Sequence, residues 1–397
     1  MRFKTSKRTG EIHYAIRDLI LPAREIEKTG DKVIRMNIGD PNKYDFDTPQ
    51  EMKDALCDAT AKGHNYYSES EGYMPLREAA ADYYKGRDVK VDAEDVFVTS
   101  GVSESLLFLF GAFMNHGDEL LIPGPSYPPY TSYSHFYGAN PIEYRTAEDE
   151  GWVPDVDDIR NSITGDTRAI VVINPNNPTG ACYGKKTLKE ICDVAAENGL
   201  FIISDEIYDA LVYEEDYVSP AAVCKDVPMI LLNGISKTCF APGWRVGYTV
   251  FHDNTEKLDD VKECFAKQGR MRLSPNTPCQ VASVVGVKNA QRFAGEQFAR
   301  LKERRDFAYK RLNEIDGIST QKPGGAFYIF PKIENCEDDK QFVLDLLNQE
   351  HVLFVHGSGF GGKYGTGHLR SVFLPPLEMQ EEAFGRLERF MKRGKTR

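Results

Sequence analysis

Two cations near the middle of the chain, Lys237 and Arg245, are residue types that a cofactor site would need. Lys237 follows the apolar run 229–232, and Arg245 stands further on in another apolar segment. Long cations are costly to bury, so the simpler interpretation is a solvated lysine and an arginine whose head group reaches water. The alternative is a lysine that forms a Schiff base with a cofactor aldehyde and an arginine that holds the cofactor's phosphate. The residues elsewhere in the chain determine which of these two interpretations is favoured.

Short apolar runs alternate with helical stretches between about residues 95 and 250. The runs lack polar alternation, which is typical of a mostly parallel sheet that is buried on both faces by helices. The predicted strands are 96–98, 119–122, 169–173, 200–203, 229–232 and 246–250. Ligands bind at the carboxyl ends of strands in such sheets. We therefore expect the functional residues directly after these runs.

Two of these strand ends lead into turns that favour ligand binding. The segment 99–104 is a Gly/Ser turn that opens a helix, so its free backbone N–H groups could bind an anion, although an ordinary helix cap is an equal alternative. The proline-rich loop 123–130 carries Tyr127, whose ring could stack on a flat ligand. A rigid turn with exposed tyrosines is the alternative for that loop.

The next two strand ends carry more specific strings. Residues 174–180 read Asn-Pro-Asn-Asn-Pro-Thr-Gly, which contains Asn177 and repeats an Asn-Pro step. Asp205 ends a buried strand, and a carboxylate there needs a cation or a proton. A protonated pyridine nitrogen would supply the cation, while a helix cap or a metal ligand are alternatives for Asp205 alone.

In this order, these strings resemble those of the class I pyridoxal-phosphate (PLP) aminotransferases of fold type I. The resemblance rests on Asn-Pro-x-Asn-Pro-Thr-Gly at 174–180, Asp-Glu-x-Tyr at 205–208, Ser-Lys-Thr at 236–238 and Gly-Trp-Arg-x-Gly-Tyr at 243–248, and it covers nearly the whole chain. Stretches 14–18, 37–41, 123–130 and 354–361 are most similar to archaeal alanine aminotransferases. The resemblance implies an α/β fold with a large PLP-binding domain at 48–299. A smaller α+β domain would be built from 1–47 and 300–397.

The resemblance also implies roles for the residues at the strand ends. Lys237 would form the Schiff base and move the proton between the substrate Cα and the cofactor. Asp205 would pair with the ring nitrogen, Tyr208 and Asn177 would bind the ring oxygen, and Tyr127 would stack on the ring. The phosphate would be held by Gly101, Val102, Ser103, Ser236 and Arg245. Many members of the family carry a serine where this chain has Gly234, so we expect the phosphate to depend more on Arg245.

Substrate binding and assembly follow from the same resemblance. Arg370 would clamp the substrate carboxylate, with Gly39 and Asn177 beside it. Arg17, on a helix that could act as a lid, would bind the distal carboxylate of 2-oxoglutarate. Tyr67, or the adjacent Tyr66, would reach the phosphate of a neighbouring subunit, which implies a homodimer.

Composition excludes several other classes of protein. The formal charge of −11 argues against nucleic-acid or anionic-membrane binding, and the eight cysteines are scattered as in a reducing cytoplasm. The sequence has no metal-ligand spacing and no apolar run of membrane length, and we expect no signal peptide because no apolar stretch follows its basic first residues. The string 357–362 formally fits the dinucleotide motif GxGxxG but is followed by another turn, and no DNA-binding segment supports a regulator. We expect a cytoplasmic alanine:2-oxoglutarate aminotransferase with ping-pong kinetics and no metal. Aspartate, aromatic or branched-chain donors are the alternatives.

The remaining elements are predicted from periodicity and capping signals. We expect a helix at 11–30, a strand at 33–38, and capping boxes that start helices at Thr48 and Thr187. One or two long helices should span 277–315. Strands are predicted around 326–330, 351–355 and 368–373, and helices at 338–349 and 377–393.

Overall fold

The centre of the computed structural model, which describes residues 3–10, 12 and 15–394, is an eight-stranded sheet. Its strands are β2 (Val96–Thr99), β3 (Glu119–Gly124), β4 (Asn140–Ala147), β5 (Val153–Pro154), β6 (Thr167–Ile173), β7 (Phe201–Asp205), β8 (Met229–Gly234) and β9 (Gly247–His252). Their order is β2-β9-β8-β7-β6-β3-β4-β5. The five strands β8, β7, β6, β3 and β4 are parallel to one another. The strand β9 is antiparallel to both of its neighbours, and β5 is antiparallel to β4. The predicted, mostly parallel central sheet is confirmed.

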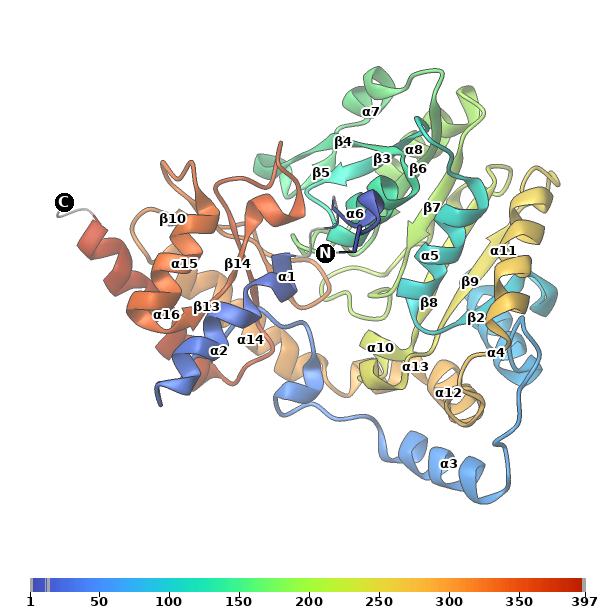
Figure 1. Cartoon of the computed structure of the whole chain (residues 1–397), viewed down its shortest axis with the longest axis horizontal. Coiled ribbons are helices and arrows are strands. Elements are labelled where there is room, and N and C mark those ends of the chain that lie inside the picture. Colours follow the sequence, from blue (N-terminus) through green and yellow to red (C-terminus); the bar gives the residue numbers. More distant parts are fainter. Residues whose placement is uncertain (1–2, 11, 13–14, 395–397) are drawn as a thin grey trace.

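Both faces of this sheet are covered, which explains why its strands carry few polar residues. In β6, Ile170 and Val172 belong to one hydrophobic core, and Val171 and Ile173 belong to the other. The first core includes residues of α4 (Met74–Lys85), α7 (Val156–Ser162), α8 (Lys185–Glu197), α9 (Pro220–Val223) and α12 (Thr277–Lys288). The second includes residues of α5 (Val102–Phe113), α6 (Pro128–Tyr137) and α11 (Asp259–Arg272). Figure 1 shows this layered arrangement, with α3 (Gln50–Ala61) lying against α12.

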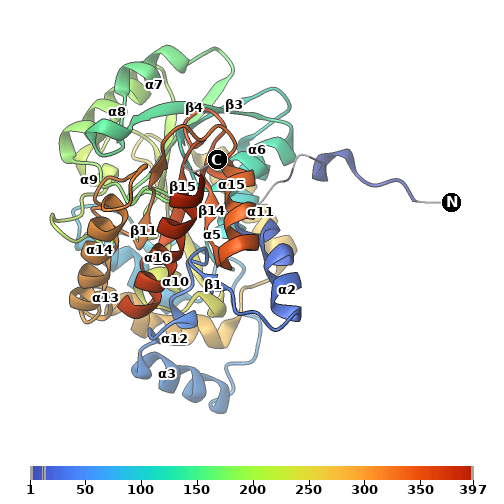
Figure 2. The same ribbon diagram turned by 90° about the vertical axis from the view of Figure 1, so that its left-hand side faces the viewer.

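The C-terminal part of the chain forms a smaller unit of helices and short strands beside the main sheet (Figure 1). Its helices are α14 (Phe298–Asn313), α15 (Asp339–Glu350) and α16 (Leu377–Gly394), whereas α13 (Ala290–Gly295) lies against α12. The strand β15 (Leu369–Val372) lies between β11 (Tyr328–Ile329) and β14 (Val355–His356), and β10 (Ile318–Ser319) pairs with β12 (Lys332–Ile333). From the other end of the chain, β1 (Ile34–Arg35) pairs in parallel with β13 (Val352–Leu353). Figure 2 shows β1 and α2 (Ile20–Lys28) beside the C-terminal helices.

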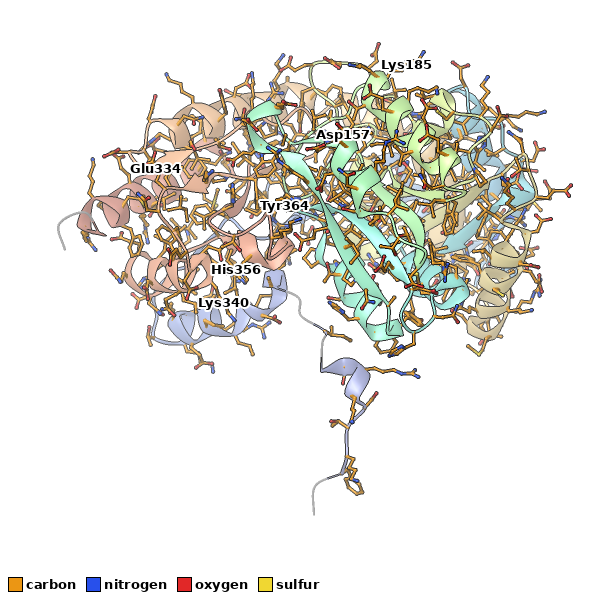
Figure 3. All side chains as sticks on the ribbon, turned by 90° about the horizontal axis from the view of Figure 1, so that it is seen from above. Asp157, Lys185, Glu334, Lys340, His356 and Tyr364 are labelled. Atoms are coloured by element: carbon orange, nitrogen blue, oxygen red, sulfur yellow. The ribbon has the colours of Figure 1, made fainter. Side chains whose placement is uncertain are left out.

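The C-terminal part meets the main sheet at the end of β3. Figure 3 labels Tyr364 at this junction, with Lys340 and His356 on one side and Asp157 on the other. A Cβ atom on Gly124 would lie 2.4 Å from the ring of Tyr364, so only glycine fits this approach. The 3₁₀ helix η6 (Gly357–Phe360) precedes this loop, and the next regular element among the described residues is β15. A dinucleotide site would need an α-helix after the glycine string, and that interpretation fails here.

The N-terminal elements are shorter than predicted. Instead of one helix at 11–30, the structure has α1 (Ala15–Asp18) and α2, and Glu11, His13 and Tyr14 lie outside the described residues. Pro22 has no N–H for the carbonyl of Asp18, which interrupts the helical hydrogen bonds at this point. The predicted strand 33–38 is reduced to β1.

Both predicted capping boxes are wrong in detail. The hydroxyl of Thr48 donates to the carbonyl of Phe240 at 2.8 Å, so it does not cap α3, which begins at Gln50. The helix α8 begins at Lys185, because its first backbone bond runs from Leu188 to the carbonyl of Gly184.

The segment 277–315 forms three helices rather than one or two. Between α12 and α13, the amide of Asn289 donates to the carbonyl of Val285 at 2.9 Å and competes with the helix backbone. A second break follows Gly295, before α14.

Two further findings concern membrane spans and cysteines. None of the helices formed by the described residues has the length and apolarity that a membrane crossing requires. All eight cysteines are free thiols.

Candidate active site

A cavity of about 510 Å³ opens at the carboxyl ends of β6, β7 and β8. Its wall contains most of the residues that the sequence motifs single out. They are Gly39, Val102, Ser103, Tyr127, Asn177, Asp205, Tyr208, Ser236, Lys237, Arg245 and Arg370. The ends of five strands (β2, β3, β6, β7 and β8), the N-terminal segment and β15 thus meet at one place, which is the location that a doubly covered sheet favours for a ligand.

Lys237 lies on the short helix α10 (Ile235–Thr238), directly after β8. Its Nζ donates a hydrogen bond of 2.8 Å to the carbonyl of Gly39. Burial lowers the pKa of Lys237 to about 8, against the opposing effect of Asp40. At pH 8 about half of the side chain is therefore the neutral amine, compared with well under 1% for a free lysine. The amine is ready to act as a nucleophile or a base.

This lowered pKa predicts how Lys237 reacts with an amine-modifying reagent. Labelling of Lys237 by acetic anhydride in the ligand-free protein should rise with pH and level off with a midpoint near pH 8. Peptide mass spectrometry gives the extent at each pH. In the denatured chain the midpoint should move up to about 10.4, the value of a free lysine. Equal midpoints in the folded and denatured chains would contradict the prediction.

Asp205 ends β7 and is buried. The hydroxyl of Tyr130 donates to Oδ2 at 2.9 Å, and the backbone N–H of Ile207 donates to Oδ1 at 3.3 Å. Burial nevertheless raises the pKa of Asp205 to about 6, because these bonds and the charge of Lys237 offset only part of the lost solvation. Asp205 forms no ion pair with a described residue, so the site favours a ligand with a cationic group at this point.

Tyr130 is a site residue that the sequence analysis missed. It is buried in α6, outside the cavity wall, and its hydroxyl holds the carboxylate of Asp205. Its only signal in the sequence is its place at the end of the aromatic loop 123–130.

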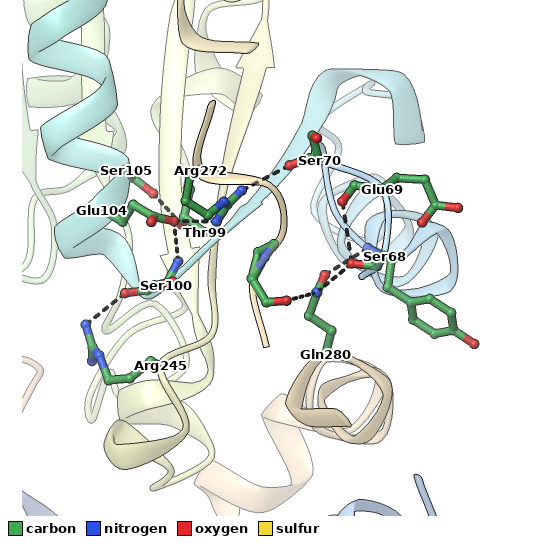
Figure 4. A network of polar contacts seen from close by, with 12 residues as sticks. Ser68, Glu69, Ser70, Thr99, Ser100, Glu104, Ser105, Arg245, Arg272 and Gln280 are labelled. Carbon is green, nitrogen blue, oxygen red and sulfur yellow. Dashed lines mark hydrogen bonds and ion pairs between the residues drawn. The ribbon is translucent and has the colours of Figure 1, made fainter. Parts of the chain in front are cut away.

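The anion-binding end of the cavity is formed by the start of α5 and by Arg245. Gly101 caps α5 with a φ of +75°, and a Cβ atom there would lie 2.5 Å from Nη2 of Arg245. Arg245 donates to the carbonyl of Ser100 at 3.0 Å (Figure 4). It also donates to the carbonyl of Pro242 at 3.1 Å. Gly101 itself is not part of the cavity wall, whereas Val102 and Ser103 are. A helix N-terminus beside an arginine is a suitable cradle for a phosphate.

The glycine at 234 has a steric cause in this chain. A Cβ atom on Gly234 would lie 2.7 Å from the Cα of Gly247 and 2.8 Å from the carbonyl oxygen of Val246. No side chain fits there unless β8 and β9 move apart. Ser236, two residues further on, lines the cavity and can offer a hydroxyl in place of one at position 234.

Arg370 lies on β15 at the opposite end of the cavity and is only 1% exposed. Its Nη1 donates to Oδ1 of Asn177 at 3.2 Å, and its Nη2 donates to the carbonyl of Asn37 at 2.6 Å. Its Nε is buried without a partner, and it forms no ion pair with any described carboxylate. A buried guanidinium with unused donors fits a ligand carboxylate.

Two predicted residues besides Gly101 do not line the cavity. Tyr66 and Tyr67 are 53% and 78% exposed and lie on the surface. Arg17 is on α1, whose Ile16 lines the cavity, but the side chain of Arg17 lies outside the described part of the structure.

Comparisons with known proteins agree with this geometry. The profile of the family "Aminotransferase class I and II" matches residues 31–387. The glutamate-pyruvate aminotransferase AlaA of Escherichia coli (strain K12) is 37% identical over 398 residues, which cover 97% of each chain. The alanine aminotransferase of Mycobacterium bovis is 35% identical over 98% of this chain and 92% of its own. Among solved structures, an alanine aminotransferase from Pyrococcus furiosus superposes with a TM-score of 0.96 and 56% identity over 98% of this chain and 100% of its own.

Proposed function

Because the chain belongs to the class I and II aminotransferase family, we propose that it transfers the amino group of L-alanine to 2-oxoglutarate with pyridoxal 5'-phosphate as the cofactor. One observation carries this proposal. The amine of Lys237, the carboxylate of Asp205 and the guanidinium of Arg370 line one cavity, and none forms an ion pair with a described residue. The relatives named for alanine and glutamate-pyruvate transfer support the choice of substrates.

The residues present fit the cofactor. When bound, pyridoxal phosphate supplies an electrophilic aldehyde and an electron-accepting ring. The unpaired carboxylate of Asp205 would hold the ring nitrogen in its protonated form, and Tyr127 would face the ring. Tyr208 and Asn177 would bind the ring oxygen. The start of α5, with Val102 and Ser103, would hold the phosphate together with Ser236 and Arg245.

The protein side of the reaction is then a matter of binding and proton transfer. Arg370 and Asn177 would hold the substrate carboxylate, with the backbone of Gly39 next to it. The Lys237 amine would take the proton from the substrate Cα and deliver it to the C4′ carbon of the cofactor. Donor and acceptor both need the guanidinium of Arg370, so the first product must leave before the second substrate binds. This requirement predicts ping-pong kinetics.

A panel of donors and acceptors tests the proposed function. The purified enzyme, loaded with pyridoxal phosphate, should form pyruvate and glutamate in equal amounts from alanine and 2-oxoglutarate. Parallel initial-rate lines at several fixed acceptor concentrations would indicate the ping-pong order. If kcat/KM is much higher for aspartate, an aromatic or a branched-chain amino acid than for alanine, that amino acid is the donor instead. Product formation without stoichiometric transfer would exclude transamination.

Arg17 is proposed to bind the distal carboxylate of 2-oxoglutarate. Replacing it with alanine should raise the KM for 2-oxoglutarate about 10-fold or more, because a charge-assisted hydrogen bond contributes about 1.5–3 kcal/mol. The KM for alanine, which has no second carboxylate, should stay within about twofold. Steady-state kinetics of the Arg17→Ala variant with each substrate measure both values. An unchanged KM and turnover for 2-oxoglutarate would contradict the assignment.

We also propose that the active unit is a homodimer. Four large apolar side chains, Tyr66, Tyr67, Met271 and Leu273, are 53%, 78%, 83% and 52% exposed. The hydroxyl of Thr277 donates to the carbonyl of Tyr66 at 2.6 Å, which holds the two segments together. Such a patch on a surface favours a partner. The hydroxyl of Tyr66 is 3.2 Å from Nδ1 of His64, which supports Tyr67 as the residue that reaches the neighbouring phosphate.

A charge on this patch should therefore separate the subunits. The Leu273→Asp variant is expected to sediment as a monomer at micromolar concentration and to bind pyridoxal phosphate more weakly, because Tyr67 of the other subunit would be missing. Leu21→Asp, at a 66% exposed leucine of α2, is the control and should keep the mass of the parent protein. Analytical ultracentrifugation decides, and a parent protein that sediments as a monomer would overturn the proposal.

The division into domains at 48–299 and the two chain ends, and the cytoplasmic location, stay predictions. Ile16 of α1 and Ile20 of α2 line the cavity, which supports a role for the N-terminal segment in closing over the substrate.

A further inference from the structure

Tyr328 lies between two groups of the candidate active site. It is on β11, is 3% exposed, and lines the cavity. Its hydroxyl is 2.8 Å from the hydroxyl of Tyr208, and its ring lies 4.6 Å from Cζ of Arg370. The sequence motifs did not single it out.

The ring of Tyr328 holds the guanidinium of Arg370 together with a second aromatic ring. Phe360 of η6 lies 4.8 Å from the same Cζ atom. Two aromatic rings within this distance stabilise a buried cation without a carboxylate, by about 0.5–2 kcal/mol for each contact. Neither ring uses an N–H donor of the guanidinium, so Arg370 can be buried and still bind a ligand carboxylate through Nε and its remaining N–H groups.

The hydroxyl of Tyr328 affects the proton of Tyr208. Each tyrosine hydroxyl has one proton to donate. If Tyr328 donates to Tyr208, the proton of Tyr208 is free to point into the cavity, and the donation strengthens it as a donor. The position of Tyr328 is also tightly defined, because a Cβ atom on Gly39 would lie 2.2 Å from its hydroxyl oxygen. Gly39 in turn accepts the hydrogen bond from Lys237.

We propose that Tyr328 is a positioning residue with two separable roles in this site. Its hydroxyl makes Tyr208 a stronger donor toward the cofactor's ring oxygen, and its ring fixes the guanidinium of Arg370 for the substrate carboxylate. The inference rests on the proposed function, since it needs a cofactor at Tyr208 and a carboxylate at Arg370.

Two substitutions separate the two roles. Tyr328→Phe removes the hydroxyl and keeps the ring, whereas Tyr328→Leu removes both. The first measurement uses the pyridoxal-phosphate-loaded enzyme without substrate and follows the absorbance of the cofactor as the pH is changed. The midpoint of this absorbance change should rise by about 0.5 pH unit or more in both variants. The reason is that a weaker hydrogen-bond donor at Tyr208 stabilises the anionic form of the ring oxygen less. The affinity for propionate, a carboxylate without an amino group, should fall about 2- to 30-fold in Tyr328→Leu and stay near the parent value in Tyr328→Phe. Spectrophotometric titration and calorimetry provide these two values.

Tyr144→Phe is the matched control, because it removes another buried tyrosine hydroxyl, whose 2.8 Å bond goes to the carbonyl of Val171. It should change neither value. A midpoint in Tyr328→Phe that stays or falls would overturn the role of the hydroxyl, and unchanged propionate binding in Tyr328→Leu would overturn the role of the ring. Neither measurement needs turnover, so a preference for another amino donor would refute the proposed substrate alone. Failure to bind pyridoxal phosphate would refute the proposed function itself.

Discussion

Replacing Lys237 with alanine is expected to reduce transamination by about 10⁴-fold or more. The variant loses both the amine that would hold the cofactor covalently and the base that would move the substrate proton, and general-base catalysis alone contributes about 10²–10⁴-fold. The lowered pKa of Lys237 makes it the amine suited to both tasks near neutral pH. Single-turnover kinetics with alanine, followed by absorbance, measure the loss.

A small primary amine should restore part of this activity. The truncated side chain leaves space in the cavity for methylamine, and the rate should rise with the concentration of its neutral form. The exposed Lys186, on α8, offers a control, and Lys186→Ala should keep the parent rate. A Lys237→Ala enzyme that retains activity within about tenfold of the parent would refute the assignment.

The fold could be predicted from the sequence where burial alone determines the pattern. The run 169–173 is apolar at every position because its side chains point alternately into the two hydrophobic cores. The strand β6 is found there, as predicted. Element ends were harder to predict, because the competing contact comes from elsewhere in the chain. Thr48 has the residue type of a helix cap, but its hydroxyl is taken by the carbonyl of Phe240, which is 192 residues away.

The same difference separates the predicted site residues from the missed ones. Asp205 and Lys237 directly follow apolar runs, so their place at the edge of the sheet could be read from the chain. Tyr130 contacts Asp205 and Tyr328 contacts Arg370, and each pair is far apart in the sequence. No local sequence pattern can therefore predict these contacts. The roles that we assign to these side chains stay predictions until the variants are measured.

Steric contacts also account for a departure from the family pattern. Gly234 stands where a serine is often found in the family, and the close approach of Gly247 leaves no space for a Cβ atom. The backbone of β8 and β9 therefore excludes a side-chain hydroxyl at position 234. This places more of the expected phosphate binding on Arg245 and on the start of α5.

Asp205→Asn is expected to lower kcat by about 10²–10³-fold and to stabilise the ligand-free protein at the same time. The loss in rate follows because an amide cannot keep the ring nitrogen protonated, and one preorganised electrostatic partner contributes about 2.7–4 kcal/mol to a transition state. The gain in stability follows from the pKa of Asp205, which is raised to about 6 in the folded chain. Since a carboxylate in the unfolded chain titrates near pH 3.9, the parent protein loses stability as pH rises from about 4 to 6, by up to about 3 kcal/mol. The asparagine has no charge to bury.

The two effects of Asp205→Asn therefore have different pH dependences. Denaturant unfolding of the ligand-free proteins should give equal free energies of unfolding below about pH 4 and a more stable variant above about pH 6. Asp209→Asn removes another buried carboxylate, one that accepts from Tyr83 and Asn233 at 2.9 Å each outside the cavity, and it should leave the absorbance of the loaded enzyme unchanged. If Asp205→Asn loses rate without gaining stability at high pH, the carboxylate is already compensated by the protein. The cost of burying an unpaired charge here would then be absent, and with it the reason to expect a cationic ring nitrogen at this point.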